Sequence, residues 1–364
     1  MGEKIPTHPG PGAIVCPVQP KTRRRLRRGA ILVHLPLPFV RLLGKMQPAD
    51  GKLAHDLPSA RVRKGLGQRI ALDRARLRPQ DVQMIIVGTC SPDYVFPATA
   101  CFVQNDLGAS RAGAFDIEAA CTSFVSALAV ARGMIVSGAI QNALVIGAET
   151  LSRFLNWKDR TTCVLFGDGA GAVVLEATNA SVGIESVILH SDGSQGDKLM
   201  IPAGGARIPA TQQTLDRGQH LITMQGGDVF KLAVKSMADA AEEALAEAGL
   251  GLDDIALMIP HQANIRIIEQ VAKRLHFPME RVFVNIQRYG NTSAASIPIA
   301  VCEAEATGRL RRGDKVLLVA FGGGFTWGAS VLEWFGAHDG VRPPGPLERA
   351  REALEDVVER VRPA

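Results

Sequence analysis

Three short motifs in this 364-residue chain carry side chains that could perform covalent chemistry. The first contains Cys121, which follows a short apolar segment and directly precedes a helix of small residues. A thiol at a helix N-terminus faces unpaired backbone N–H groups and the positive end of the helix dipole, and both favour the nucleophilic thiolate. The other two motifs are Pro260–Asn264, which contains His261, and Gly290–Ser296, which contains Asn291.

Each of these side chains has an ordinary structural explanation when it is taken alone. Most cysteines pack as small apolar side chains, and an asparagine before a helix is a common N-cap. The three share one feature, because each follows a predicted buried strand. In an α/β fold such positions converge at the carboxyl ends of the strands, where ligands bind. We therefore predict that Cys121, His261 and Asn291 form one catalytic site.

The strands and helices that position these motifs occur twice in the sequence, which indicates an internal duplication. In each half, a helix end and a turn with Asp lead into a buried strand, and a second apolar strand precedes the catalytic motif. A helix of small residues and a further apolar strand follow. Uninterrupted apolar strands that alternate with helices predict parallel strands covered on both faces. The paired segments are 71–88 with 244–260, 114–117 with 282–286, and 143–147 with 316–320.

The composition is that of a globular protein with a large core, since 46% of the residues are hydrophobic. No stretch approaches the roughly 20 apolar residues of a membrane span, so we expect no membrane attachment. The six cysteines show neither CxxC spacing nor Cys/His spacing of a metal site. Because they read as unpaired thiols, we predict a cytoplasmic protein without a bound metal.

Four segments with different composition divide the chain. Residues 1–70 are basic and rich in proline, residues 71–180 and 181–336 are the two duplicated halves, and residues 337–364 form a linker and a charged helix. The basic run Arg23–Arg28 could bind nucleic acid or a membrane surface, but no aromatic residues are interleaved with it. We interpret it as a solvated charged run and expect no nucleic-acid partner.

Four motifs together resemble β-ketoacyl-[acyl carrier protein] synthase III, a condensing enzyme of the thiolase-like superfamily. They are AACTSF around Cys121, PHQANIRI at 260–267, GNTSAASIP at 290–298 and FGGGFTWG at 321–328. The resemblance extends from about residue 71 to residue 335. It implies the duplicated, five-layered α/β/α/β/α thiolase-like fold and an acyltransferase that initiates type II fatty-acid biosynthesis.

The resemblance also implies a role for each catalytic group. Cys121 would take the acyl group of a short acyl-CoA, with acetyl-CoA as the expected donor. His261 and Asn291 would donate hydrogen bonds to the thioester oxygen of malonyl-[acyl carrier protein] and stabilise the enolate left by decarboxylation. The backbone N–H groups of Cys121 and Gly323 would form an oxyanion hole. This chemistry needs no metal or redox cofactor.

Further positions that match the family imply two binding surfaces. Arg160 matches a residue near the adenine of coenzyme A, and Phe96 matches a residue that closes the acyl pocket of a neighbouring subunit, which implies a homodimer. An arginine equivalent to Arg266 helps to bind the acyl carrier protein. Spacings of seven and eight residues place two further basic side chains on the same helical face. The predicted carrier-protein contacts are Gln262, Arg266, Lys273 and Arg274.

The first 70 residues depart from the family. They lack the family's first strand and the tryptophan-containing segment that contacts coenzyme A, so we hypothesise a divergent or frame-shifted N-terminus. Ala30–Leu35 could supply a substitute strand, but neighbouring prolines argue against a central position. From the duplication we expect the missing strand to be central and to pair with the segment Ser186–His190.

Three alternatives to a fatty-acid synthase remain at the level of the sequence. A related acyltransferase of secondary metabolism would use the same three catalytic residues on another acyl group or acceptor. An inactive relic would retain the fold with a damaged coenzyme A site. A cysteine hydrolase would use water as the acceptor, but the motifs around Asn291 and Gly323 disfavour it. The acyl chain length that the pocket accepts is not predicted.

Overall fold

Two main β-sheets, one from each half of the duplication, form the frame of the computed structural model, which describes residues 30–34, 66–178 and 182–335. The first sheet has the strand order β1-β5-β4-β2-β3, and the second has the order β6-β11-β10-β9. The strands of the first sheet are β1 (Ala30–His34), β2 (Met84–Gly88), β3 (Gly113–Ile117), β4 (Asn142–Thr150) and β5 (Asp168–Thr178). Those of the second are β6 (Ile184–Ser191), β9 (Leu257–Pro260), β10 (Lys315–Gly322) and β11 (Thr326–Glu333).

The four strands of the second sheet repeat the topology of β1, β5, β4 and β2 in the first, which confirms the internal duplication at the level of structure. In the first sheet β2 runs parallel to β3 and β4, and β5 is antiparallel to β4 and β1. In the second, β9 runs parallel to β10, and β11 is antiparallel to β10 and β6. The strands predicted from the apolar runs are parallel as expected, since β2 pairs with β3 and β4, and β9 pairs with β10. Each sheet is nevertheless mixed, because β5 and β11, which those runs did not include, pair antiparallel with β4 and β10.

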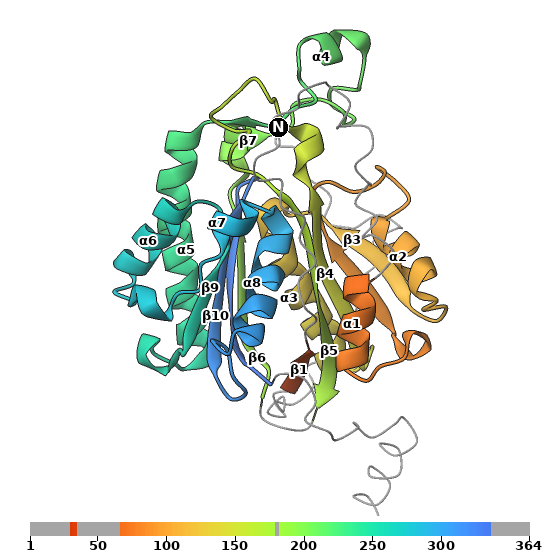
Figure 1. Ribbon diagram of the computed structural model, residues 1–364, viewed down its shortest axis with the longest axis vertical. Helices are drawn as coiled ribbons and strands as arrows, with labels where there is room; N and C mark the ends of the chain where they lie inside the picture. Colours follow the sequence, from red (N-terminus) through yellow and green to blue (C-terminus); the bar gives the residue numbers. More distant parts are fainter. Residues whose placement is uncertain (1–29, 35–65, 179–181, 336–364) are drawn as a thin grey trace, which may run out of the picture.

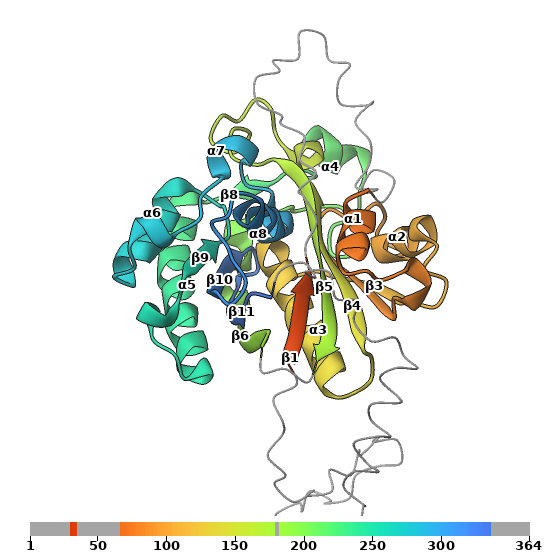
Figure 2. The same ribbon diagram turned by 60° about the horizontal axis from the view of Figure 1, so that its bottom comes forward.

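Helices alternate with the sheets to give five layers (Figures 1 and 2). Two helices lie between the sheets, two cover the outer face of the first sheet, and two cover the outer face of the second. The inner helices are α3 (Ser123–Val136) and α8 (Ser296–Ala306). The outer ones are α1 (Leu66–Arg74) and α2 (Thr99–Leu107), and on the other side α5 (Gly226–Ala248) and α6 (Ile265–Arg274). The predicted α/β/α/β/α layering is confirmed.

Burial of apolar side chains explains why the inner helices are mostly apolar. Phe124 and Leu128 of α3 and Ile297 of α8 are each 1% exposed and pack in one cluster with strands of both sheets. A helix with a single apolar stripe fits an outer layer, as in α5, where Val229, Ala233 and Met237 face the second sheet. Burial on more than one face fixes the inner helices between the sheets, and their first residues lie at the predicted catalytic motifs.

Smaller elements lie near one end of the sheets. The two-stranded pair β7 (Leu199–Met200) and β8 (Thr223–Met224) encloses an excursion that contains α4 (Gln212–Asp216), seen at the top of Figure 1. The short helix α7 (Ile286–Tyr289) leads into the Asn291 motif.

Two expectations about strands need correction. The strand β1 pairs with β5 at the edge of the first sheet, where we expected a central strand paired with the segment that forms β6. In the second sheet, β6 holds the equivalent edge position beside β11, so the duplication is kept. The predicted pairing with the β6 segment is wrong, because β1 pairs with β5. The segment 282–286 forms only one bridge, Met258 to Val282, because α7 begins at Ile286.

The predicted segment boundaries at residues 70, 180 and 336 stay predictions. The basic run Arg23–Arg28 and the predicted C-terminal helix lie outside the described residues.

Candidate active site

Cys121 lies in a tight turn between β3 and α3. The turn is a 3₁₀ segment, Ala120–Thr122, and Ala120 adopts a φ of 46°. The Ser123 hydroxyl holds this turn, because it accepts a hydrogen bond from Ala119 N at 2.8 Å and donates one to Ala120 O at 2.7 Å. The left-handed residue turns the chain sharply, so that Cys121 stands immediately before the inner helix, as its sequence context predicts.

A cavity of about 390 Å³ opens in front of Cys121. The predicted oxyanion-hole residue Gly323 lines the same cavity, so the structure brings these two predicted residues together. The lining also includes apolar side chains suited to a short acyl chain. Residues that line the cavity include Cys90, Cys121, Leu151, Phe166, Ser293 and Gly323.

Burial decides the protonation state of the Cys121 thiol, which is 8% exposed. It raises the pKa of the thiol to about 12, although a hydrogen bond from Ser293 acts in the opposite direction. The sequence predicts that the helix N-terminus alone makes a thiolate available, and this prediction underestimates the cost of desolvation. The resting form near pH 7 is therefore the neutral thiol.

His261 follows β9 and is 1% exposed. Its Nδ1 lies 2.6 Å from Oγ of Ser296, the first residue of α8. Burial lowers the pKa of His261 to about 3, so the imidazole is neutral near pH 7. A neutral imidazole can donate one hydrogen bond to a ligand from the nitrogen that Ser296 does not contact.

Asn291 is 7% exposed, and both its backbone and its side chain are held in place. The backbone N–H donates to Leu165 O, and the backbone oxygen accepts from Gly167 N, each at 2.8 Å. The side-chain Oδ1 accepts a hydrogen bond from Ser293 N at 2.8 Å. Because Oδ1 is occupied, the amide NH₂ of Asn291 is the group left to contact a substrate.

The segment Asn291–Ser296 connects the three predicted catalytic residues. Asn291 is bonded to Ser293, Ser293 shares the cavity with Cys121, and Ser296 holds His261. The turn Ser293–Ala295 begins with a φ of 46° at Ser293, the same value as Ala120, and this turn packs against the turn of Cys121. Neither serine was predicted to act in the site, although both lie within the GNTSAASIP motif.

Glu149 is a further buried group that the sequence analysis missed. It lies near the end of β4 with 2% exposure. Its carboxyl group accepts hydrogen bonds from Ser91 Oγ at 2.5 Å and Thr89 Oγ1 at 3.3 Å, and Cys90 Sγ lies 3.4 Å away. Burial raises the pKa of Glu149, and hydrogen bonds from Ser91 and Ser293 oppose that shift. A carboxylate at the end of an otherwise apolar strand was the signal in the sequence.

Comparison with known proteins places this site in a family. The family model for 3-oxoacyl-[acyl-carrier-protein] synthase III matches residues 115–193, and the model for its C-terminal part matches residues 245–334. A β-ketoacyl-[acyl-carrier-protein] synthase III from Roseiflexus sp. (strain RS-1) is 54% identical over 266 residues, which is 73% of this chain and 81% of that protein. The chain belongs to the β-ketoacyl-[acyl carrier protein] synthase III family.

Solved structures of this family have the same fold. The synthase III from Thermus thermophilus is 41% identical, with a TM-score of 0.71 over 78% of this chain and 86% of that one. The synthase III from Aquifex aeolicus VF5 is 40% identical, with a TM-score of 0.70 over 84% of this chain and 99% of that one. The thiolase-like fold predicted from the sequence is therefore confirmed.

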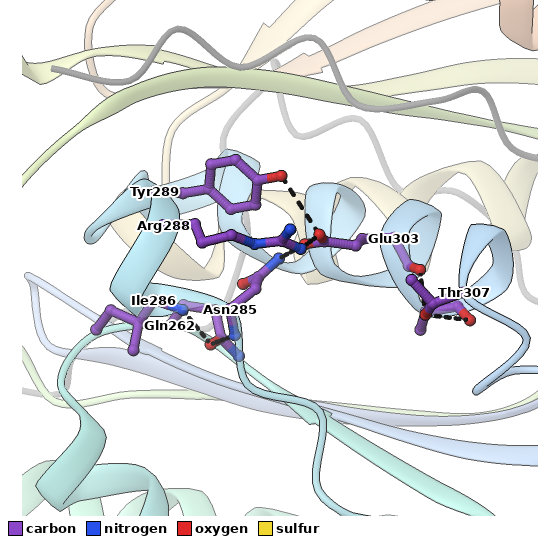
Figure 3. Close-up of polar contacts among 8 residues, drawn as sticks. Gln262, Asn285, Ile286, Arg288, Tyr289, Glu303 and Thr307 are labelled. Atoms are coloured by element: carbon purple, nitrogen blue, oxygen red, sulfur yellow. Dashed lines mark hydrogen bonds and ion pairs between the residues drawn. The ribbon is translucent and has the colours of Figure 1, made fainter. Parts of the chain in front are cut away.

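Gln262 occupies a different place from the carrier-protein surface predicted for it. It is 1% exposed, and its amide crosslinks two loops (Figure 3). Nε2 donates to the backbone oxygens of Pro260 and Phe283 at 2.8 and 3.2 Å, and Oε1 accepts from Asn285 N at 3.0 Å. Gln262 thus joins the end of β9, next to His261, to the loop that leads to Asn291.

Glu303 of α8 extends this crosslink. Its Oε2 accepts a hydrogen bond from Asn285 Nδ2 at 2.8 Å, and its other oxygen contacts Arg288 and Tyr289 of α7 (Figure 3). The buried side chains of Gln262 and Glu303 therefore hold the loop before Asn291 from both sides. A buried polar group without a hydrogen-bond partner lowers the free energy of unfolding. Such a network therefore stabilises a single position of the loop.

The other three residues predicted to contact the acyl carrier protein lie on one helix at the surface. Arg266, Lys273 and Arg274 are exposed on α6, whose apolar side packs on α5. Arg274 forms an ion pair with Asp239 of α5 at 3.3 Å. A basic exposed face exists where the sequence predicts it, but its function stays a prediction.

The predicted substrate contacts Phe96 and Arg160 do not line the Cys121 cavity. Phe96 is 84% exposed on the loop after β2, next to Val95, which is 92% exposed. Arg160 is exposed on the loop between β4 and β5. Within the part of the chain that the structure describes, no cluster of metal-ligating side chains occurs and no helix has the length and apolar character needed to cross a membrane.

Proposed function

We propose that this chain condenses a short acyl group from acyl-CoA with malonyl-[acyl carrier protein] to form 3-oxoacyl-[acyl carrier protein], the first condensation of type II fatty-acid biosynthesis. The observation that supports it is the segment Asn291–Ser296, which links a buried cysteine, a neutral buried histidine and an oriented asparagine. Membership of the synthase III family supports the same reaction.

Cys121 begins the reaction as the nucleophile. Its thiolate attacks the thioester carbon of acyl-CoA, the carbonyl electrons move to oxygen, and collapse of this intermediate expels coenzyme A as a thiolate. The backbone N–H groups of Cys121 and Gly323 stabilise the oxyanion. Both residues line the cavity, and the apolar side chains of Leu151 and Phe166 surround the acyl group. The expected donor is acetyl-CoA, as the family resemblance implies.

His261 and Asn291 act in the second step. Decarboxylation of the malonyl group leaves negative charge on its thioester oxygen, and two fixed donors stabilise that charge. Ser296 Oγ accepts a hydrogen bond from Gln262 N at 3.3 Å, so its own proton is available to His261 Nδ1. This assigns the imidazole proton to the other nitrogen, which then donates to the substrate. The resulting carbanion attacks the acyl group on Cys121.

The exposed residues support a set of partners. The basic face of α6, with Arg266, Lys273 and Arg274, would bind the acidic acyl carrier protein, and Arg160 would contact coenzyme A. The exposed apolar loop Tyr94–Phe96 would pack against a second copy of the chain and close its acyl pocket.

The reaction uses acyl-CoA and malonyl-[acyl carrier protein] as substrates and requires no cofactor. The five described cysteines are free thiols, which suits the reducing cytoplasm.

The first test is the intact mass of the purified full-length protein after incubation with acetyl-CoA. We expect an acetyl adduct that is absent from Cys121→Ser, followed by formation of acetoacetyl-[acyl carrier protein] when malonyl-[acyl carrier protein] is added. Competition among acetyl-CoA, branched and longer acyl-CoA then gives the chain preference. A folded protein that forms no adduct with any acyl-CoA would contradict the proposal and support an inactive relic.

A further inference from the structure

The inner helix α8 carries two buried polar side chains, Ser296 at 2% exposure and Glu303 at 7%. They are seven residues apart, which is about two helical turns, so they lie on the same side of α8. Ser296 Oγ lies 2.6 Å from Nδ1 of His261. Glu303 contacts the loop that leads to Asn291. One helix therefore contacts the segments of both residues assigned to the malonyl thioester, and the proposed reaction gives Glu303 no role.

Glu303 holds α7, a single helical turn that ends two residues before Asn291. Its Oε2 accepts a hydrogen bond from Asn285 Nδ2 at 2.8 Å, at the start of α7 (Figure 3). Its Oε1 lies 3.5 Å from the Tyr289 hydroxyl and pairs with the Arg288 guanidinium, at the end of α7. A four-residue helix has too few internal hydrogen bonds to be stable alone, so contacts of this kind determine its position.

The position of α7 reaches Asn291 through one intervening residue, Gly290. Gly290 N donates to Ile286 O at 2.8 Å, which closes α7 directly before Asn291. Gly290 has a φ of 67°, and a Cβ atom there would lie 3.1 Å from Leu165 O, the acceptor of the Asn291 N–H. The turn is tight and its conformation is restricted, so a displacement of α7 also displaces Asn291.

We propose that Glu303 is a positioning residue for decarboxylation, because it holds α7 and thereby the amide of Asn291. This rests on the proposed function, in which His261 and Asn291 stabilise the enolate. Two donors stabilise a developing charge best when both are fixed before the charge forms. Ser296 and Glu303 lie on one helix, so α8 sets the separation of the two donors. The acylation of Cys121 uses neither donor and should not depend on Glu303.

A carboxylate suits this role, because its two oxygens can accept hydrogen bonds from both ends of α7 at the same time. Arg288 balances the charge of Glu303, so the pair adds no net charge near the donors. Two residues further along α8, Glu305 forms an ion pair of 2.9 Å with Arg74 of α1, in the other half of the duplication. The same helix thus supplies a second acidic side chain for comparison.

The decisive measurement compares the two half-reactions in Glu303→Ala. Acetylation of Cys121 by acetyl-CoA should keep the wild-type rate. Release of carbon dioxide from malonyl-[acyl carrier protein] should be about 10²-fold slower, the usual cost of a displacement of about 1 Å at a catalytic group. The loss should appear in kcat with little change in KM, because the exposed face of α6 is intact. A purely structural role would lower both half-reactions by the same factor, and equal losses or unchanged decarboxylation would overturn the proposal.

Further variants test the hydrogen bond between Glu303 and Asn285. Asn285→Ala removes the same contact from the other side and should give the same loss, also where Glu303→Ala does not fold. The double variant should be no slower than the slower single variant, because both changes remove one interaction. Glu303→Gln keeps an oxygen acceptor for Asn285 Nδ2, so it should decarboxylate faster than Glu303→Ala. Additive losses, or a Glu303→Gln rate as low as that of Glu303→Ala, would disprove the link.

Glu305→Gln is the matched control on the same helix. It removes the charge that pairs with Arg74 and should leave both half-reactions unchanged. A loss of decarboxylation as large as that in Glu303→Ala would mean that any change in α8 disturbs the site, and it would contradict a specific role for Glu303. Thermal unfolding shows which variants are folded.

Hydrogen–deuterium exchange reports the position of α7 without any reaction. In Glu303→Ala or Asn285→Ala, backbone amides of segment 285–291 should exchange about 10-fold faster, because a buried polar contact is lost. Segment 119–128, around Cys121, should exchange as in the wild type. Unchanged exchange at 285–291 would refute the role of Glu303, whatever the activity. Faster exchange there, in a protein whose wild type releases no carbon dioxide from malonyl-[acyl carrier protein], would refute the proposed condensation while confirming that Glu303 positions the Asn291 segment.

Discussion

A Cβ atom on Gly322 of β10 would lie 2.6 Å from the backbone nitrogen of Cys121, which is closer than side chains approach backbone atoms. The counterpart in the other half is Gly147 of β4, where a Cβ atom would overlap the backbone of Ala294. Ala294 belongs to the turn that begins at Ser293. The central strand of each half therefore supports the active-site turn of the other half, and this requires the smallest residue.

Replacing Gly322 with alanine should move the Cys121 turn. The added methyl group meets backbone rather than a flexible side chain, so we expect a loss of about 1–3 kcal/mol in stability from overpacking. A displacement of about 1 Å at the nucleophile typically costs about 10²-fold in rate. The rate of acetyl-adduct formation and the unfolding midpoint measure the two effects.

The matched control is Gly133→Ala in α3, where no atom lies within 4 Å of the added Cβ. Alanine has the higher helix propensity, so this variant should be more stable by about 0.5–1 kcal/mol and acetylate normally. Normal acetylation of Gly322→Ala would show that the turn tolerates the methyl group.

Replacing His261 or Asn291 with alanine should separate the two half-reactions. Both side chains are assigned to the malonyl thioester, so acetylation of Cys121 should persist while condensation falls by about 10²–10³-fold for each. Acetyl-adduct mass and release of carbon dioxide from malonyl-[acyl carrier protein] report the two steps. Equal losses in both steps would contradict this division of roles.

The neutral state of His261 makes the fold sensitive to acid. Burial lowers the pKa of His261 from 6.5 to about 3. Between these values the unfolded chain binds one proton more than the folded chain, so the stability contributed by the neutral imidazole is complete above pH 6.5 and decreases as the pH falls toward 3. We expect the unfolding midpoint of the wild type to fall more steeply between pH 7.5 and 4.5 than that of His261→Gln. Parallel curves would show that another group controls acid stability.

The buried position of Gln262 predicts a stability effect rather than a binding effect. Gln262→Ala leaves backbone groups of Pro260, Phe283 and Asn285 without their partner, which should cost about 1–3 kcal/mol. The KM for acyl carrier protein should change little. Arg266→Glu on the exposed face of α6 should instead raise that KM several-fold, more at low salt, with unchanged stability. A raised KM for acyl carrier protein with unchanged stability in Gln262→Ala would instead support the predicted binding role of Gln262.

The exposed loop Tyr94–Phe96 predicts an interface between copies of the chain. Phe96→Glu would place a charge in an apolar contact, so sedimentation should show a shift from dimer toward monomer. Met279→Glu is the control, because Met279 is an exposed apolar residue, at 38% exposure, on a different loop. A wild-type monomer at micromolar concentration would refute the predicted homodimer.

Strand and helix periodicity was enough to predict the frame of this fold. Apolar runs located β4 and β10, and the duplication located the two catalytic turns, because burial on both faces leaves a strong pattern. The same pattern did not reveal β5, which begins with the glycine-rich run Asp168–Gly171, and it does not give the order of strands within a sheet. The antiparallel pairing of β5 and the edge position of β1 were therefore beyond it.

Within the site, residue type identified the chemistry but not the environment. Cys121 could be identified as a nucleophile from its motif, but its raised pKa depends on how completely the fold buries it. Gln262 lies in the same motif as His261, and nothing in the motif distinguishes a buried crosslink from a surface contact. Glu149 and Ser293 are 144 residues apart in sequence, so only the packed halves bring them together.

The edge position of β1 decides how far the first sheet depends on the N-terminal segment. The ladder β5-β4-β2-β3 is complete without β1, so the strands that carry the active-site turns do not depend on it for their order. An edge strand is held mainly by backbone hydrogen bonds to one neighbour, and many unrelated sequences can supply these. The frame that carries Cys121 and the turn at Ser293 is therefore ordered by residues 84–178 and 184–333, independently of the segment that supplies the edge strand.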